Sequence, residues 1–353
     1  MGLNISDNSI ELIQLGPDGS KKEFPVVEAW SRSALPKGIV VGGAIANKEY
    51  LVTLLATLYQ KPHFGIFSSK NLYFALSESQ AYILDLSIAS GLEDALQREM
   101  LEAELEKHIP FPLTELAFDY YEYSGDKKKQ LVNVSLIPLS ILKDYLEIFK
   151  FAGWNTKNVE LESHCLVRAL VHAPEDHPIL IIDMGARNTL CFIYDGSAIR
   201  KNMSVSLGSD LLTEKVAKEL NIGSKEAEIK KRKEGFDPEI EGGRIFSVMQ
   251  GELQDLILEA RLMMKTYFGE TGRAVSAIIC TGGGALIPGL DRYLESDLEA
   301  KVTVGMIDDS SGSFENSWKC LFPVAWGAAA KGIFPTLKNG TGINFLADPD
   351  LKL

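Results

Sequence analysis

Cysteine is scarce in this chain of 353 residues, and the positions of its few copies exclude several kinds of site. The four thiols, Cys165, Cys191, Cys280 and Cys320, are scattered without a C-x-x-C spacing, and two of them lie within apolar strand patterns. This distribution favours reduced thiols in a core over a disulfide framework or a zinc site, as in a cytoplasmic protein. The five histidines show no H-x-x-x-H spacing, so no metal centre is predicted from them.

Long apolar runs and an excess of positive charge are also missing. No apolar stretch approaches the roughly 20 residues of a membrane helix, and the amino end has no basic-then-apolar signal segment. The formal net charge of -12 repels nucleic acid and anionic lipid. The sequence therefore predicts neither a membrane span nor a nucleic-acid surface. Walker A, G-x-G-x-x-G and G-x-S-x-G motifs are absent as well.

The most informative motif that is present begins with an apolar strand at Ile179 and continues as D-x-G-x-x-x-T. Asp183 at the strand end can hold a hydrated Mg²⁺ ion and is the candidate catalytic residue. Gly185 lets backbone amides approach phosphate oxygens, and Asn188 and Thr189 can supply further donors. A plain β-hairpin uses the same turn residues, so the motif alone leaves both interpretations open.

Two further elements have the order that a two-lobed nucleotide clamp needs. The chain opens with a strand, turn and strand over 3–15, and a buried strand at 277–281 runs into a glycine turn. Such a turn removes every Cβ, so backbone can approach a ligand closely, although a tight strand-to-helix connection looks the same. The predicted nucleotide-binding residues in these two elements are Ser6, Asp7, Ser9, Gly282, Gly283 and Gly284. Together the three elements resemble the phosphate-1, phosphate-2 and adenosine motifs of the actin, Hsp70 and sugar-kinase superfamily.

Further residues narrow the resemblance from this superfamily to one family within it. They are Ile109-Pro110-Phe111-Pro112 with Asp119-Tyr120, the run from Gly208 to Ala217 leading into Ala227-Glu228, and Gly283-Gly284 with Leu286, Gly289 and Leu290. With these residues, from 2 to about 332, the chain resembles the PilM family of type IV pilus assembly proteins. The resemblance implies an α/β, actin-like (ribonuclease H-like) fold of two lobes with an inserted FtsA-type βαββα subdomain.

A chain of this length is expected to form more than one lobe. We expect lobe I over 1–33, 155–177 and 320–337, the inserted subdomain over 34–154, lobe II over 178–319, and a flexible carboxyl tail over 338–353. Within the insert, Leu92, Leu96 and Met100 recur at helical spacing and predict a helix over 91–108 that buries these side chains.

The resemblance also implies that ATP with Mg²⁺ binds between the lobes. By motif match, Glu228 and Lys231 grip the nucleoside, although a charged helix face with i,i+4 pairs has the same pattern. The first hairpin departs from the family, because Asn4 and Ser6 replace an acidic residue and a glycine, and Glu11 replaces a phosphate-facing Lys. Asp183 is then the main cation-organising carboxylate unless Asp7 takes that role, and at most slow ATP hydrolysis is expected.

The insert supplies the partner-binding candidates. Phe111 lies between two prolines that end a helix, which either presents the ring at a surface or serves only as a rigid helix stop. Tyr120 and Tyr121 could extend an aromatic patch. In PilM relatives, a groove of the insert-carrying lobe holds the cytoplasmic amino-terminal segment of PilN, a single-span membrane protein. The resemblance thus implies a cytoplasmic scaffold, peripheral at the inner membrane, with other pilus components and self-association as further contacts.

Three further hypotheses concern the carboxyl end of the chain and two alternative functions. Gly342-Ile343-Asn344-Phe345-Leu346 resembles the I-N-L-L segment of PilN, so the tail either mimics the partner or is a frayed terminus. A small-molecule kinase would need a base beside an acceptor hydroxyl, which residues 34–154 do not obviously supply. An FtsA-like division protein would need a basic amphipathic helix at the carboxyl end, whereas this tail is acidic and short.

Overall fold

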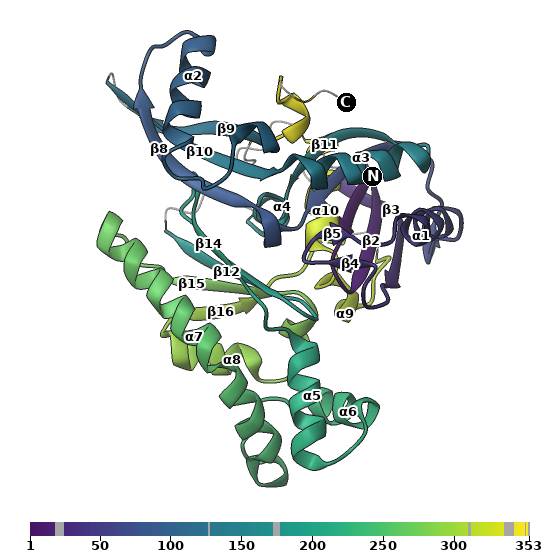
Figure 1. Cartoon of the computed structure of the whole chain (residues 1–353). Coiled ribbons are helices and arrows are strands. Elements are labelled where there is room, and N and C mark those ends of the chain that lie inside the picture. Colours follow the sequence, from purple (N-terminus) through teal and green to yellow (C-terminus); the bar gives the residue numbers. More distant parts are fainter. Residues whose placement is uncertain are drawn as a thin grey trace.

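The computed structural model describes residues 1–17, 25–125, 128–171, 177–309, 312–334, 342–349 and 351. Residues 18–24, 172–176 and 335–337 of the expected lobe I, 126–127 of the expected insert, 310–311 of the expected lobe II, and 338–341, 350, 352 and 353 of the expected tail lie outside these ranges. The strands in the described ranges form a six-stranded, a five-stranded and a three-stranded sheet and one short ribbon (Figure 1). None of the helices in these ranges is long and apolar enough to cross a membrane.

The six-stranded sheet forms lobe I and has the order β11-β7-β1-β2-β3-β6. Its strands are β1 (Gly2–Ile5), β2 (Ser9–Pro17), β3 (Pro25–Ala34), β6 (Phe64–Gly65), β7 (Asn71–Leu76) and β11 (Asn155–Leu161). The inner strands β1 and β2 are buried along nearly their whole length because helices cover both faces of the sheet. One face packs against α1 (Lys48–Gln60) and α3 (Leu139–Phe151), and the other against α4 (Glu162–Leu170) and α10 (Pro323–Ile333).

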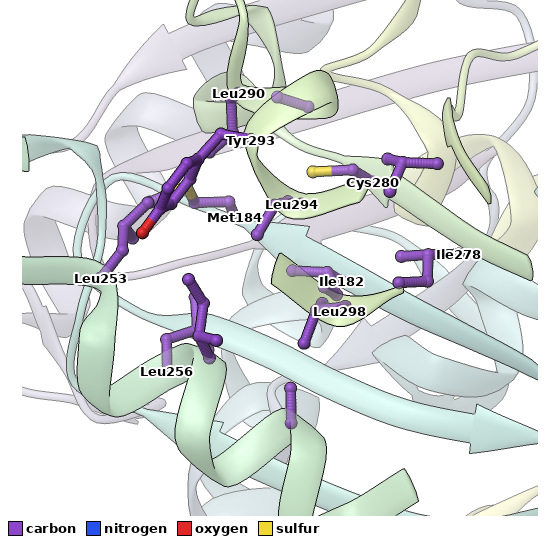
Figure 2. Close-up of a cluster of buried hydrophobic side chains, with 14 of the residues drawn as sticks. Ile182, Met184, Leu253, Leu256, Ile278, Cys280, Leu290, Tyr293, Leu294 and Leu298 are labelled. Carbon is purple, nitrogen blue, oxygen red and sulfur yellow. The ribbon is translucent and has the colours of Figure 1, made fainter. Parts of the chain in front are cut away.

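The five-stranded sheet forms lobe II and has the order β14-β13-β12-β15-β16. Its strands are β12 (Ile179–Met184), β13 (Thr189–Tyr194), β14 (Ile199–Val205), β15 (Ala277–Thr281) and β16 (Lys301–Val304). The outer face packs against α7 (Arg244–Thr271) and α8 (Leu290–Leu298), and Figure 2 shows Leu256 and Leu298 gathered about Ile182. Lobe II is completed by α5 (Ser209–Leu220) and α6 (Ser224–Glu234).

The two lobes share a core. Successive residues of β12 face opposite ways, so Leu180 and Ile182 pack toward α7 and α8 while Ile179 and Ile181 join the cluster built on α4 and α10. That cluster also contains Ile13 of β2, so α4 and α10 lie between the sheets of the two lobes. This shared layer packs the two lobes against each other beside the cleft in which the hairpins meet.

The third sheet gives the insert its own small core. It has the order β8-β10-β9, from β8 (Tyr82–Ala89), β9 (Leu116–Gly125) and β10 (Lys129–Pro138), with α2 (Asp94–Leu105) packed on one face. With α3, these elements follow the chain in the expected βαββα order. The expected boundaries of 34–154 are too wide, however, because α1 packs on the lobe I sheet and β7 pairs with β1 within it.

The remaining described elements are short. They are the ribbon β4 (Val40–Val41) and β5 (Ala44–Ile45), α9 (Asn316–Lys319), and the 3₁₀ turns η1 (Glu78–Gln80), η2 (Leu113–Glu115), η3 (Ile240–Gly243), η4 (Gly283–Leu286) and η5 (Phe345–Ala347). The predicted helix over 91–108 is shorter and differently rotated. Leu96 and Met100 are 47% and 39% exposed, whereas Leu101 and Leu105 are fully buried.

Candidate functional site

A cavity of about 410 Å³ lies where the two hairpins and the glycine turn meet. The β1–β2 turn of lobe I, the β12–β13 turn and η4 of lobe II, and one face of α6 contribute to its lining. The predicted residues that line it are Ser6, Asp7, Ser9, Asp183, Gly185, Asn188, Glu228, Gly282 and Gly283. Thr189, Lys231 and Gly284 do not line it.

The β12–β13 hairpin is held to the start of α5. The Gly185 amide donates to the Asn188 carbonyl at 3.0 Å, and the Ser209 amide donates to the Gly185 carbonyl at 3.0 Å. Thr189 is not available to a phosphate, because its fully buried hydroxyl donates to the Leu207 carbonyl at 2.6 Å. The predicted donor role of Thr189 is therefore wrong; the side chain instead fastens the hairpin to the chain that leads into α5.

The glycine turn after β15 lies directly beside Asp183. Gly282 has φ of 81°, and a Cβ on it would lie 2.3 Å from Asp183 Oδ1. A side chain on Gly284 would instead reach within 2.4 Å of Met184 Cγ, so that glycine serves packing under the turn. Close approach of the two strand ends explains why this turn lacks Cβ atoms.

The floor of the cleft collects carboxyl groups. Burial, together with the neighbouring Glu11, raises the pKa of Asp183 to about 7. Burial, with Asp183 and Glu78 nearby, raises the pKa of Glu162 to about 8. The pKa of Glu78 is also raised by burial. Four buried acidic side chains, Glu11, Glu78, Glu162 and Asp183, thus have raised pKa values in one place, an environment that a cation would stabilise.

This donor set fits a Mg²⁺ ion held through its water shell. In the described part of the chain, no three His, Cys, Asp or Glu side chains converge closely enough to ligate a metal directly. Mg²⁺ gives up its waters reluctantly and commonly binds proteins through one or two carboxylates and substrate phosphates. Among the carboxylates that line the cavity, Asp183 lies at the end of β12 directly beside the glycine turn, and it is the group that would hold such a hydrated ion.

Glu11 does not oppose phosphate as a bare negative charge. Arg32 Nε donates to Glu11 Oε1 at 2.9 Å, and Asn4 Nδ2 donates to Glu11 Oε2 at 3.2 Å. Burial nevertheless raises the pKa of the Glu11 carboxyl, with Arg32 acting in the opposite direction. Arg32 thus offsets the charge of Glu11 within lobe I, and Asn4 serves to hold Glu11.

Asp7 is committed to the ribbon β4–β5. Its carboxylate accepts from the amides of Gly42 at 2.7 Å and Gly43 at 3.1 Å. Ser6 Oγ accepts from the Ser9 amide at 3.0 Å, which closes the turn. Asp7 is therefore a residue that shapes the first hairpin, and the structure gives no support to its taking over the cation-holding role.

Arg187 is a cavity residue that the sequence analysis missed. Its Nη1 donates to the backbone oxygen of Asp7 at 2.6 Å, across the cleft from lobe II to lobe I. Its Nε and Nη2 are shielded from solvent and have no hydrogen-bond partner among the described residues. The signal in the sequence was a basic residue inside the D-x-G-x-x-x-T motif itself, two residues before its last residue, Thr189. A cation there suits phosphate oxygens.

Glu228 and Lys231 lie together, but only Glu228 reaches the cavity. Lys231 is 1% exposed, and its Nζ donates to Ser209 O at 2.8 Å and Thr213 Oγ1 at 2.7 Å and contacts Glu228 Oε2 at 2.7 Å. Although burial alone would raise it, these bonds and Arg232 bring the pKa of Glu228 down to about 2. Glu228 is therefore an ionised carboxylate at the cavity wall, held in place by Lys231, Thr213 and Arg232.

Comparison with known proteins identifies the family. A family model described as type IV pilus assembly protein PilM matches residues 2–312. The chain belongs to the PilM family. A solved PilM–PilN type IV pilus biogenesis complex matches with a TM-score of 0.79 and 20% identity over 94% of this chain and 98% of that chain.

Two other solved structures show that this chain has an actin-like fold. The ethanolamine utilization protein EutJ from Carboxydothermus hydrogenoformans matches with a TM-score of 0.56 and 14% identity, covering 93% of this chain and 88% of that one. MreB5 of Spiroplasma citri bound to ADP matches with a TM-score of 0.51 and 16% identity, covering 95% and 96%. The predicted actin-like, two-lobed α/β fold is confirmed, and the kinase and FtsA-like alternatives are not favoured.

The predicted aromatic surface of this PilM chain is divided. Phe111 is 49% exposed and lines a second cavity of about 760 Å³ beside Tyr82, with 6.3 Å between the ring centroids. Tyr120 and Tyr121 are neighbours on β9 and therefore face opposite sides of the sheet. Tyr120 packs with the core under α2, whereas Tyr121 packs toward lobe I near His164. The three rings do not form one patch.

Proposed function

We propose that this PilM-family protein is a nucleotide-binding scaffold of the type IV pilus assembly platform, and that ATP with Mg²⁺ binds in the cleft between its lobes. One observation supports nucleotide binding above all: Asp183, both hairpins and the glycine turn line the same cavity. Gly185 and Asn188 line that cavity at the phosphate end, and Glu228 with Gly282 and Gly283 lines it at the nucleoside end.

Charge complementarity supports the same assignment. Bound Mg²⁺ would offset the charge of Asp183 and of the phosphates, and the free donors of Arg187 point to an anionic ligand. MreB5, which has the same fold, was solved with ADP. We expect turnover below about 1 per second, a low enzyme rate, because Asn4 holds Glu11 in lobe I and supplies no second cation-binding carboxylate.

We further propose that a PilN-like membrane protein recruits this chain through a short cytoplasmic segment. The similarity to a PilM–PilN complex over nearly the whole length of both chains supports this assignment. Such recruitment would bring the chain to the membrane surface, although none of its described helices could cross a membrane.

Titration calorimetry with ATP and Mg²⁺ tests the cleft. Asp183→Ala should abolish binding, because it removes the carboxylate that organises the cation. Asp255→Ala, an exposed carboxylate on α7 away from the cavity, should bind as the wild type does. Equal affinity in all three proteins would overturn the site. A wild-type turnover above about 1 per second would overturn the scaffold role in favour of an enzyme.

A further inference from the structure

The carboxyl-terminal residues are packed into the molecule. Ile343 and Phe345 are fully buried, and η5 lies against β9 and β11 in the view of Figure 1, next to the label of the carboxyl end. Leu346 and Leu351 pack partly buried against the same core. The expectation of a flexible tail therefore fails for the described residues from Ile343 to Leu351.

The seat of this segment lies between the edges of two sheets. β11 is the outermost strand of the six-stranded sheet, and β9 is the outermost strand of the three-stranded sheet. Edge strands present unpaired amide and carbonyl groups, which are ready sites for another length of chain. The segment thus closes a groove whose two walls belong to lobe I and to the insert.

Asn344 bridges the two walls of the groove. The Val159 amide of β11 donates to Asn344 Oδ1 at 3.2 Å, and the Asn344 amide donates to Asp119 Oδ2 of β9 at 2.6 Å. The same Oδ1 accepts from the Leu346 amide at 3.2 Å and so begins the turn of η5. An asparagine is well suited to this position, because one side chain accepts from the groove and shapes its own backbone.

Charged groups hold the two ends. Lys331 of α10 donates to the Ile343 carbonyl and also contacts Glu160 Oε2 at 3.1 Å. Arg98 of α2 donates to Asp348 Oδ1 at 2.9 Å, and the Phe118 amide donates to Asp348 Oδ2 at 3.1 Å. The groove therefore recognises a sequence pattern, apolar-Asn-apolar-apolar-x-Asp.

These contacts are of the kind that a domain makes with a bound peptide. Amides of the edge strands donate to side chains of the segment, at Val159 and Phe118, while the alternate side chains of Ile343 and Phe345 are fully buried in the apolar core. Few of these contacts lie within a helix or a strand that the segment forms with the rest of the chain. Without the segment, the groove would keep its apolar floor, the Val159 amide, Asp119 and Arg98, which is a complete set for another peptide of the same pattern.

We propose that this groove is a peptide-recognition site, that residues 343–348 occupy it in cis, and that a membrane-anchored partner's peptide of the same pattern replaces them. The partner's part in this rests on the proposed function, whereas the occupancy in cis does not. A tethered segment has an effective concentration in the millimolar range, so the groove is closed to weak ligands and opens to a partner concentrated at the membrane.

The first experiment uses the full chain and a labelled synthetic peptide of residues 342–351, followed by fluorescence anisotropy. Asn344→Ala with Phe345→Ala weakens only the tethered segment, so the double variant should bind the free peptide at least about tenfold more tightly than the wild type. Ala347→Ser, at an exposed position of the same turn, should behave as the wild type. Equal affinities in all three chains would overturn the proposal.

The second experiment does not depend on substitutions in the segment. A protease site placed between Phe334 and Gly342 is cut after folding, and the nicked protein is passed through gel filtration at falling concentration. Release of the fragment on dilution, and rebinding when it is added back, supports an exchangeable ligand. A fragment that never leaves the folded body would make the segment a fixed part of the core and would refute the exchange.

A third experiment separates occupancy of the groove in cis from its use by the partner. Unlabelled peptide from the amino end of the candidate partner is titrated against the labelled peptide bound to the double variant, and Arg98→Ala in the groove should weaken both. If the chain's own peptide binds and the partner's does not displace it, occupancy in cis stands and the partner assignment fails. If neither peptide binds, the groove is not a peptide site.

Discussion

Arg187 and Asp7 join the two lobes across the cleft, with 2.6 Å between Arg187 Nη1 and the Asp7 backbone oxygen. The contact uses one nitrogen of the guanidinium and leaves Nε and Nη2 shielded and without a partner among the described residues. A buried donor left unpaired costs about 1–3 kcal/mol, and more when the group is charged. An anionic oxygen of a bound ligand would remove this cost, so the proposed phosphate site and the contact between the lobes would share one side chain.

Replacing Arg187 should therefore weaken nucleotide binding without unfolding the protein. We expect Arg187→Gln to raise the dissociation constant for ATP with Mg²⁺ at least about tenfold, which corresponds to about 1.4 kcal/mol. Arg187→Lys should recover only part of this, because an ammonium group cannot reproduce the planar, forked donors. Calorimetry measures both, with Arg292→Gln on the exposed surface of α8 as the matched control. Unchanged affinity in Arg187→Gln would remove the residue from the site.

The sequence predicted the elements of the site better than the direction of its side chains. Strand-turn-strand patterns around Asp183 and the glycines after Cys280 are local features, and both elements form where they were expected. Whether Thr189 faces the cavity depends on the position of the Leu207 carbonyl, which only the folded chain provides. Arg187 was missed for the same reason, since its partner Asp7 lies 180 residues away.

The insert shows the same limit. The apolar pattern of β7 is equally compatible with either neighbouring sheet, and only its pairing with β1 assigns it to lobe I. For α2, the prediction took Leu96 and Met100 as buried positions, whereas Leu101 and Leu105 are buried. The predicted helix was therefore rotated about its axis relative to the observed one. The opposite faces of Tyr120 and Tyr121 followed from strand periodicity and could have been predicted.

Thr189 tests whether a side chain of the β12–β13 hairpin has a structural role or binds a ligand. Thr189→Val keeps the shape but loses the bond to the Leu207 carbonyl, leaving a buried acceptor unpaired. We expect the free energy of unfolding to fall by about 1–3 kcal/mol. Affinity for ATP should stay within about twofold, since no contact to the cavity is lost. Urea denaturation and calorimetry measure the two quantities; a large loss of affinity with intact stability would restore Thr189 as a phosphate ligand.

The carboxyl groups of the cleft should make stability depend on pH in a defined direction. Glu162 and Asp183, with pKa values of about 8 and 7, keep protons in the folded protein that the unfolded chain releases near pH 4. The folded state thus binds more protons over this window, so these groups lower stability as pH rises from about 4 to about 8. His164 and the terminal amine, whose pKa values are lowered by burial, act in the opposite direction.

The variant Glu162→Gln isolates this effect, because the opposing groups are common to both proteins. Its stability relative to the wild type should rise steadily between pH 5 and pH 8, since an amide has no proton to lose over this range, whereas the buried Glu162 carboxyl has a pKa of about 8. Urea titrations at pH 5, 6.5 and 8 give the difference. A difference that is flat with pH, or that falls, would show that the cleft carboxyls are already ionised at pH 5.

The glycine turn supplies a matched pair of substitutions. A Cβ on Gly282 would lie 2.3 Å from Asp183 Oδ1, and its φ of 81° is unfavourable for any side chain. A Cβ on the adjacent Gly283 would lie 3.5 Å from Leu321 Cδ2, which is ordinary contact. Gly282→Ala should therefore lower the free energy of unfolding by at least about 1–2 kcal/mol, the cost of left-handed backbone alone.

The same pair distinguishes a cation-organising Asp183 from a passive one. In Gly282→Ala the new methyl group must displace the Asp183 carboxylate or the turn, so Mg²⁺-dependent ATP binding should be lost together with stability. Gly283→Ala leaves Asp183 in place and should change the free energy of unfolding by no more than about 1 kcal/mol, the scale of a Gly-to-Ala change in helical backbone. Calorimetry with and without Mg²⁺ reads out binding. If Gly282→Ala still folds and binds ATP with undiminished Mg²⁺ dependence, the cation is held by a group other than Asp183.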